Sequence, residues 1–460
     1  MPGEGMPGCA SGTLTRETDL RMFIRFTWVL GFVALVSIAL LVACSGNYSP
    51  SNDGLVLVPS QGEAIVQSFS FSLNKGGVST IDSNPTIPGP PDQGFPGSIV
   101  IDPAGAFAYV TSVNTPDATT DPCTKKSVIA SYKINTDGSL NAPLSTNLGQ
   151  NVIPVALAID SAGKYLFVAN SSVCEPNNLQ TGAPGTVTVL SIGSNAALTA
   201  VGTFPVPATP GGGPANLVAL AVTPTVFPKQ GSVDQSPPCS LKNPPSSEFL
   251  YVADAQNNGV WMFSVDTSSG NLTLIPYSST QADAPAGSVP SGVAVDPCGQ
   301  WVYVSNQVSN NVSAYKICNI VSQPICPVAS GALAPITGSI NGSTFPTGNG
   351  PGPLVVSPED NALYVLDKAA NATAGDISAF QISQSNGSLS PLSPATVATG
   401  NMPVSIAIRS DNNWLFVTNN GSASGNGSIS QYSVTPATGA LAPSGSGILT
   451  DTYPWGLAVK

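Results

Sequence analysis

Side chains suited to acid–base or metal chemistry are scarce in this chain. Its 460 residues include 25 acidic and 14 basic side chains but no histidine. Histidine is the residue most often used for proton transfer near neutral pH, and it is the commonest metal ligand. The sequence also has no P-loop, GxSxG, HExxH or calcium-loop motif. We therefore expect no metal and no cofactor, and most enzyme mechanisms lack their usual residues here.

The charge balance narrows the classes of partner. Only 8% of residues are charged, the formal net charge is -11, and glycine and proline number 46 and 43. Beyond Arg25 the only arginine is Arg409. A nucleic-acid-binding surface needs clustered basic side chains to neutralise phosphates. The composition therefore predicts a turn-rich, weakly charged protein that does not bind nucleic acid. We also expect a monomer.

The N-terminal segment has the pattern of an export signal. Eighteen uncharged residues, 26–43, follow Arg21 and Arg25 and end in Leu-Val-Ala before Cys44. This resembles a bacterial lipoprotein signal, in which the cysteine after the cleavage site carries the lipid. An uncleaved membrane anchor is the alternative, since eighteen apolar residues nearly span a bilayer. We expect residues 1–43 to be an extension and signal, residues 44–54 an anchored linker, and the rest to lie in the periplasm or on the cell surface.

A repeating unit organises residues 55–460. Each unit has a strand, usually led by proline, then a strand ending in an aromatic residue or leucine followed by valine, then an alternating strand with a large apolar residue. Turns of the form Gly-x-Leu follow the third strand. Each piece occurs seven times, and the seven first pieces start at residues 96, 154, 217, 290, 351, 403 and 454.

The two ends of the repeat array are complementary. The first unit lacks the leading strand, and the chain ends on an unpaired leading strand, residues 454–459. If that last strand pairs with the strand beginning at Leu55, the array closes into a ring without an open edge. The sequence therefore predicts an all-β, seven-bladed β-propeller with four-stranded antiparallel blades. A linear solenoid would instead carry polar capping repeats at its ends.

The blade motif carries a family resemblance. The segments 303–306 (YVSN), 416–419 (FVTN) and 251–254 (YVAD) resemble the repeats of the seven-bladed lactonase propellers, which include 6-phosphogluconolactonases and muconate-lactonising enzymes. This resemblance covers residues 55–460 and implies the propeller fold. Packing alone explains the motif, because aromatic residues fill the wedge between blades and Asn or Asp caps the next turn. The implied lactonase activity therefore needs separate support.

Six cysteines remain after Cys9 and Cys44 are set aside. An even number in an exported chain predicts disulfides rather than a zinc site, because no CxxC spacing and no histidine accompany them. Position within the blades narrows fifteen possible pairings to one set. We expect the pairs Cys123–Cys174, Cys239–Cys298 and Cys318–Cys326.

A ligand is expected on the face formed by the starts of the inner strands and the loops after the second strands. The candidate rim residues there are mostly amides, with one indole that could stack on a sugar: Asn151, Asp254, Asn349, Asn401, Asp451 and Trp455. These residues could equally cap turns and plug the channel. Catalytic relatives place a histidine after the leading proline, but this chain has Val155, Ser291 and Val404 at such positions. The cations Arg409 and Lys460 fall at the far end of the inner strands.

These observations favour a binding or interaction module at the cell envelope. Its membrane contact would be the lipid on Cys44, and its ligand an envelope protein, a peptide or a glycan. The alternative function is a lactonase-type hydrolase of sugar lactones with a divergent active site, because neither a base nor an oxyanion-stabilising group is identifiable. A purely structural envelope protein is a third possibility.

Overall fold

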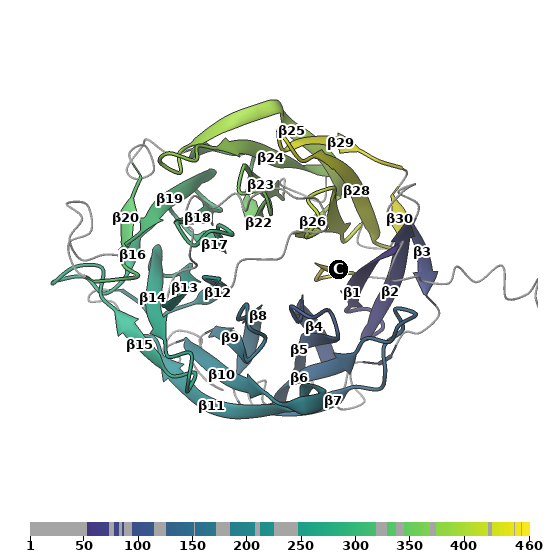
Figure 1. The fold of residues 1–460 in the computed structure, drawn as a ribbon, viewed down its shortest axis with the longest axis horizontal. Coiled ribbons are helices and arrows are strands. Elements are labelled where there is room, and N and C mark those ends of the chain that lie inside the picture. The colour runs from purple at the N-terminus through teal and green to yellow at the C-terminus, as the bar shows by residue number, and fades with distance from the viewer. Residues whose placement is uncertain are drawn as a thin grey trace, which may run out of the picture. The chain divides into compact units, whose positions relative to one another are not determined.

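The chain forms a ring of seven antiparallel β-sheets around a central axis (Figure 1). This computed structural model describes residues 53–72, 78–81, 85–86, 94–114, 126–150, 152–171, 185–207, 212–224, 247–318, 329–336, 345–368, 374–421, 426–445, 447–451 and 453–460. All of these lie in one compact unit, residues 48–460. The predicted seven-bladed propeller with four-stranded blades is confirmed. One short 3₁₀ helix, η1 (Ser194–Ala196), accompanies the strands in the described ranges.

The strands of each blade run outward from the axis in chain order, with one exception at the closure. From the inside, the first three blades consist of β31 (Ala458–Val459), β1 (Asp53–Ser60), β2 (Ile65–Ser72) and β3 (Val78–Ile81); β4 (Gly94–Ile101), β5 (Phe107–Asn114), β6 (Lys126–Lys133) and β7 (Leu144–Gln150); and β8 (Ile153–Ile159), β9 (Tyr165–Ser171), β10 (Thr186–Ile192) and β11 (Leu198–Pro205).

In three of the other four blades the outer strand is split into two pieces that pair with the same third strand. These four blades consist of β12 (Leu217–Val222), β13 (Glu248–Asp254), β14 (Gly259–Val265), β15 (Leu272–Ile275) and β16 (Ala284–Pro285); β17 (Pro290–Val295), β18 (Trp301–Asn306), β19 (Asn311–Ile317), β20 (Leu333–Pro335) and β21 (Phe345–Pro346); β22 (Pro351–Val356), β23 (Ala362–Asp367), β24 (Ala374–Ile382) and β25 (Leu389–Asn401); and β26 (Pro403–Ile408), β27 (Trp414–Asn419), β28 (Ser428–Thr435), β29 (Ala440–Pro443) and β30 (Ile448–Leu449).

The C-terminal strand completes the first blade, as predicted. Val56 pairs with Val459 and Leu57 with Ala458 in antiparallel register. The backbone groups of Leu55 and Lys460 exchange two hydrogen bonds, of 3.0 and 2.8 Å. The two ends of the array therefore share one sheet, in which β31 covers the inner edge of β1.

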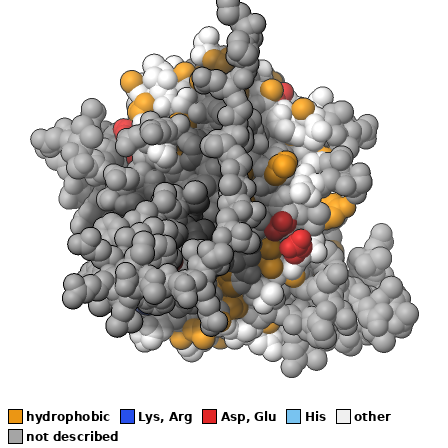
Figure 2. Space-filling model, turned by 90° about the vertical axis from the view of Figure 1, so that its right-hand side faces the viewer, with side chains coloured by type: hydrophobic (Ala, Val, Ile, Leu, Met, Phe, Trp, Pro, Cys, Tyr) orange, Lys and Arg blue, Asp and Glu red, His pale blue; other side chains and the backbone are white. Residues whose placement is uncertain are grey.

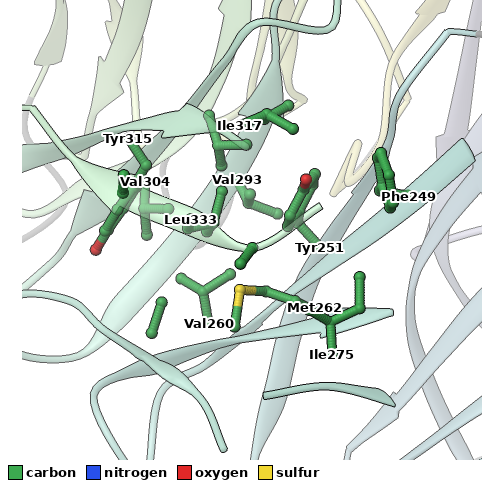
Figure 3. Packing of buried hydrophobic residues seen from close by; sticks show 14 of the residues in the cluster. Phe249, Tyr251, Val260, Met262, Ile275, Val293, Val304, Tyr315, Ile317 and Leu333 are labelled. Atoms are coloured by element: carbon green, nitrogen blue, oxygen red, sulfur yellow. The ribbon is translucent and has the colours of Figure 1, made fainter. Parts of the chain in front are cut away.

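Apolar side chains fill the space between neighbouring blades. Tyr251 and Met262 of one blade pack with Val293, Val304 and Tyr315 of the next, and all five are buried (Figure 3). The buried aromatic residues of the repeat also carry a polar contact across the boundary. The tyrosine of the second strand donates its hydroxyl to a turn of the following blade, from Tyr165 to Ser268, Tyr251 to Gly331, Tyr303 to Gly387 and Tyr364 to Gly439.

The N-terminal segment and most of the cysteines lie outside the described residues. Cys44 and the expected signal are among them, as are Cys123, Cys174, Cys239 and Cys326. Cys298 and Cys318 are buried, and each takes part in a disulfide. The pairing itself stays a prediction. Within the described ranges, no helix has the length and hydrophobicity needed to cross a bilayer.

Candidate functional site

A cavity of about 290 Å³ lies at the centre of the ring. Its wall includes residues from six inner strands and, in the first blade, from the segment leading into β31. These residues belong to the beginnings of the inner strands, the face on which the sequence predicted a ligand. The fold therefore offers one central site to which every blade contributes.

Bulges at the strand starts shape the wall of the cavity. In six blades the pairing of the inner strand with the second strand shifts register immediately after its start. A bulge bends the strand and redirects the side chain at that point. Proline is tolerated at the first position of a strand because it has no N–H to donate. Residues in these bulges that line the cavity are Gly97, Ser98, Val155, Val218, Ser291, Pro353 and Val404.

Two serine side chains of the wall join neighbouring blades. The Ser291 hydroxyl donates to the carbonyl of Pro351 at 2.6 Å. The Ser98 hydroxyl oxygen accepts from the backbone N–H of Leu157 at 3.1 Å. Because these groups bond to the adjacent inner strand, they hold neighbouring strands of the cavity wall together.

Lys368 is the one charged side chain among the described residues that line the cavity. It directly follows β23, and its backbone N–H donates to the carbonyl of Gly350. Its side chain extends over Gly352, where a Cβ atom would stand 2.4 Å from the lysine Cε. Within the described part of the chain, the amine has no hydrogen-bond or ion-pair partner. Burial lowers the pKa of Lys368, because desolvation disfavours the charged amine.

Trp455 brings an aromatic surface to the same cavity. Its side chain is 45% exposed although the residue belongs to the closing segment. Its backbone N–H donates to the carbonyl of Pro59 at 3.0 Å, which fixes the segment to the first blade. The site therefore combines an accessible indole, an amine without a partner in the described ranges and a wall of backbone and hydroxyl groups. Such a lining suits a small polar ligand with a flat or ring-shaped face.

Comparison with known proteins identifies the family. The profile described as "Lactonase, 7-bladed beta-propeller" matches residues 184–321 and 330–454, more than half of the chain. The chain belongs to this lactonase propeller family. A stretch of 74 residues is 35% identical to a 6-phosphogluconolactonase of Formosa agariphila, covering 16% of this chain and 20% of that protein. The chain thus matches about a fifth of that relative's length.

Solved structures share the fold of this lactonase-family chain. The periplasmic gluconolactonase PpgL of Pseudomonas aeruginosa is 16% identical, with a TM-score of 0.60 over 88% of this chain and 99% of that one. A candidate 6-phosphogluconolactonase of Bacteroides fragilis is 18% identical, with a TM-score of 0.61 over 90% and 99%. A protein of unknown function from Desulfotomaculum acetoxidans also matches, with a TM-score of 0.56 at 15% identity over 88% and 98%. At these identities the likeness establishes the fold alone.

The structure brings one of the six predicted rim residues to the central cavity of this lactonase propeller, namely Trp455. Asn349 and Asn401 are exposed but do not line the cavity, and Asp451 is half-buried away from it. Asn151 lies outside the described residues.

Asp254 is fully buried and serves as the cap of a turn. Its Oδ1 accepts hydrogen bonds from the backbone N–H groups of Asn216, at 2.9 Å, and Gln256, at 3.0 Å. Its Oδ2 accepts from the Asn257 amide at 2.7 Å and the Trp261 indole at 3.1 Å. Both carboxylate oxygens therefore accept hydrogen bonds from residues of the same blade. These contacts are those of a turn cap, one of the two roles that the sequence analysis gave for this residue. Its side chain does not line the cavity.

A cluster of two aspartates and a cysteine lies at the opposite end of the inner strands from the cavity. Ligand atoms of Asp296, Cys298 and Asp360 all lie within 4.8 Å of one another, and all three residues are buried. The Cys298 sulfur belongs to a disulfide, so it does not offer a thiolate to a metal. Asp296 accepts from the backbone N–H groups of Gln300 and Trp301. Asp296 therefore caps a turn, whereas the Asp360 carboxyl oxygens have no hydrogen-bond partner among the described residues. Burial, together with the neighbouring charge of Asp296, raises the pKa of Asp360.

Lys368 is the candidate site residue that the sequence analysis did not identify. The sequence places it one residue beyond the repeat segment 364–367 (YVLD), where the chain leaves the second strand on the ligand face. The sequence analysis considered only the cations Arg409 and Lys460, at the far end of the inner strands, and so omitted a cation on the ligand face. The overlooked signal is a lysine at the exit of a second strand in a chain with 14 basic residues.

Proposed function

We propose that this propeller is a lactonase-type hydrolase and that the central cavity binds a sugar lactone. The observation that carries the proposal is the joint presence of Trp455 and Lys368 in a cavity of about 290 Å³. That volume lies at the lower end of small-molecule sites and suits a ligand of monosaccharide size. Membership of the lactonase family and the activities named for the relatives support the same choice.

This proposal reverses the order of the two functions derived from the sequence. The binding-module interpretation depended on the missing histidine and on the apparent lack of any polar reactive group near the mouth. Lys368 supplies such a group, and no feature of the described surface points to a protein partner. On the side shown in Figure 2, the hydrophobic side chains that are visible among the described residues form small groups. We therefore propose the lactonase function in preference to the binding module.

In this site the indole of Trp455 stacks on the sugar ring, while wall hydroxyls and backbone groups contact its hydroxyls. The ring stacking is favoured because sugar C–H groups meet the electron-rich face of an aromatic ring. Water then attacks the lactone carbonyl, opening the ring to the hydroxy acid. The cavity restricts the orientation of the lactone during this attack.

The test is turnover by the purified full chain. Hydrolysis of δ-gluconolactone and of 6-phosphogluconolactone is followed by acid release at a pH where spontaneous opening is slow. We expect a saturable rate above the uncatalysed one, and a roughly tenfold higher KM after Trp455→Ala, equal to about 1.4 kcal/mol of lost binding. The matched control is Leu449→Ala, since Leu449 is 70% exposed and does not line the cavity. A wild-type rate equal to the spontaneous rate contradicts the proposal.

We further propose that the propeller is held at the cell envelope through a lipid on Cys44. The support is the sequence pattern of residues 21–46, since that segment lies outside the described residues. Incorporation of labelled fatty acid into wild-type protein, and its loss in Cys44→Ala, is the expected result. Release of unlabelled wild-type protein into the soluble fraction would argue against the anchor.

A further inference from the structure

Hydrolysis of a lactone by water requires a group that removes a proton from the water. The whole chain has no histidine, the usual choice. Among the described residues that line the central cavity, Lys368 carries the single acidic or basic side chain. The two acids of the repeat motif are engaged within their own blades and do not line the cavity: Asp254 accepts from Asn216 and Asn257, and Asp367 accepts from the Ser378 hydroxyl.

The surroundings of Lys368 disfavour the charged form of its amine. The described residues supply no carboxylate to it, and the cavity wall around it consists of aliphatic, backbone and hydroxyl groups with one indole. A lysine held in such a place loses its proton more easily than one in water, because the charged form is poorly solvated. Burial lowers its pKa accordingly. A neutral amine is a base, whereas an ammonium ion is not.

We propose that Lys368 is the general base of lactone hydrolysis and that Gly352 sets its position. This inference rests on the proposed function and assigns the residue that moves the proton. The Lys368 Nζ accepts a proton from water as the water oxygen bonds to the lactone carbonyl carbon. When the tetrahedral intermediate collapses, the bond from that carbon to the ring oxygen breaks. The new ammonium returns the proton to the departing ring oxygen, which yields the hydroxy acid and restores the neutral amine.

Gly352 determines where the amine lies. A Cβ at this position would be 2.4 Å from Cε and 3.2 Å from Nζ of Lys368, so even a methyl group must displace the side chain. Gly352 does not have a positive φ, and Pro353 follows it, so alanine can adopt the extended backbone found here. Gly352→Ala therefore moves the base without removing it.

The competing role for this lysine is to bind an anionic group of the ligand. The two roles are separated by Lys368→Arg, because arginine keeps the positive charge but does not lose its proton in proteins. They are separated again by the substrate, since δ-gluconolactone carries no anionic group. If the lysine only binds an anion, hydrolysis of this neutral lactone should be nearly unchanged after Lys368→Arg or Lys368→Met.

The experiment measures kcat, KM and the pH profile of the full chain with δ-gluconolactone. We expect Lys368→Met and Lys368→Arg to lower kcat by about 100-fold or more, the usual contribution of a general base, with little change in KM. The rising limb of the pH profile, where the amine loses its proton, should disappear in both.

Added propylamine should partly restore turnover in Lys368→Ala, and Gly352→Ala should lower kcat with the lysine still present. Lys133→Arg and Lys133→Met, at an exposed lysine of β6, are the matched controls.

The outcomes separate this inference from the proposed function. Wild-type turnover that survives Lys368→Arg with an unchanged pH profile overturns the base role and leaves the lactonase proposal standing. Absence of wild-type turnover overturns both. Thermal unfolding of every variant shows whether a lost rate reflects a lost fold, and the rescue by amine distinguishes missing chemistry from misfolding.

Discussion

The phenol hydroxyl of Tyr303 donates a hydrogen bond of 2.9 Å to the carbonyl of Gly387, across the boundary between two blades. Gly387 has a φ of +70°, and a Cβ there would lie 2.6 Å from the Trp301 ring. The turn therefore needs glycine both for its left-handed backbone and for the room beside the indole. Two features that recur separately in the sequence, the Tyr-Val strand end and the Gly-x-Leu turn, are thus partners in space.

This relationship predicts the effect of deleting single hydroxyls. Tyr303→Phe should lower the free energy of unfolding by about 1–3 kcal/mol, because a buried carbonyl loses its donor. Tyr109 is the matched control, since it occupies the same place in another blade but its buried hydroxyl has no partner among the described residues. In the blade that follows Tyr109, η1 replaces the glycine turn. Tyr109→Phe should be neutral or stabilising in urea denaturation, and equal losses for both variants would refute this account.

Ring closure depends on a glycine in the last segment of the chain. A Cβ on Gly456 would lie 2.7 Å from the carbonyl oxygen of Gly97 and 2.9 Å from the Pro59 ring. Gly456→Ala should therefore force the closing segment away from its neighbours and cost about 1–3 kcal/mol, the usual range for overpacking. Gly447→Ala is the control, because Gly447 is exposed and its nearest atom would be 3.5 Å away. Comparable melting temperatures for the two variants would mean that this segment does not support the ring.

The blade count and the closure could be predicted because they depend on patterns that repeat seven times. Alternation and aromatic positions are imposed by packing, so each blade repeats the signal. The site could not be predicted in the same way. The bulges that aim residues such as Val155 and Ser291 at the cavity leave no mark in the sequence, since a bulge is a property of pairing. Lys368 occurs in a single blade, and a lone lysine after a strand ordinarily indicates a solvated turn.

The distinction between capping and catalysis is testable at Asp254. Asp254→Asn places an amide N–H₂ among groups that are themselves donors, so at least one buried hydrogen bond is lost. We expect a loss of about 1–3 kcal/mol in urea denaturation. Below the melting transition, kcat and KM should equal the wild-type values, because this side chain does not line the cavity. A large fall in kcat without any loss of stability would instead place Asp254 in the reaction.

Burial of Glu248 should make the protein less stable as the pH rises, which is the opposite of ordinary acid denaturation. Both of its carboxyl oxygens are buried without a partner in the described residues. Burial, with a smaller effect from the charge of Asp160, raises its pKa from 4.5 to about 8. Burial also raises the pKa of Asp160, although Lys164 opposes that shift. The folded state therefore holds a proton that the unfolded chain has already released.

The sign follows from proton linkage. Between about pH 4.5 and 8 the folded form binds more protons at Glu248 than the unfolded form does, so stability falls as the pH rises through this window. The fall approaches about 1.4 kcal/mol per pH unit for one proton. Glu248→Gln should remove this slope and leave the protein more stable than wild type at high pH, with little difference at pH values below the window. Urea denaturation across the window measures the slope, with the exposed Glu63→Gln as control. Identical slopes in wild type and Glu248→Gln would show that the carboxyl is already ionised in the folded protein.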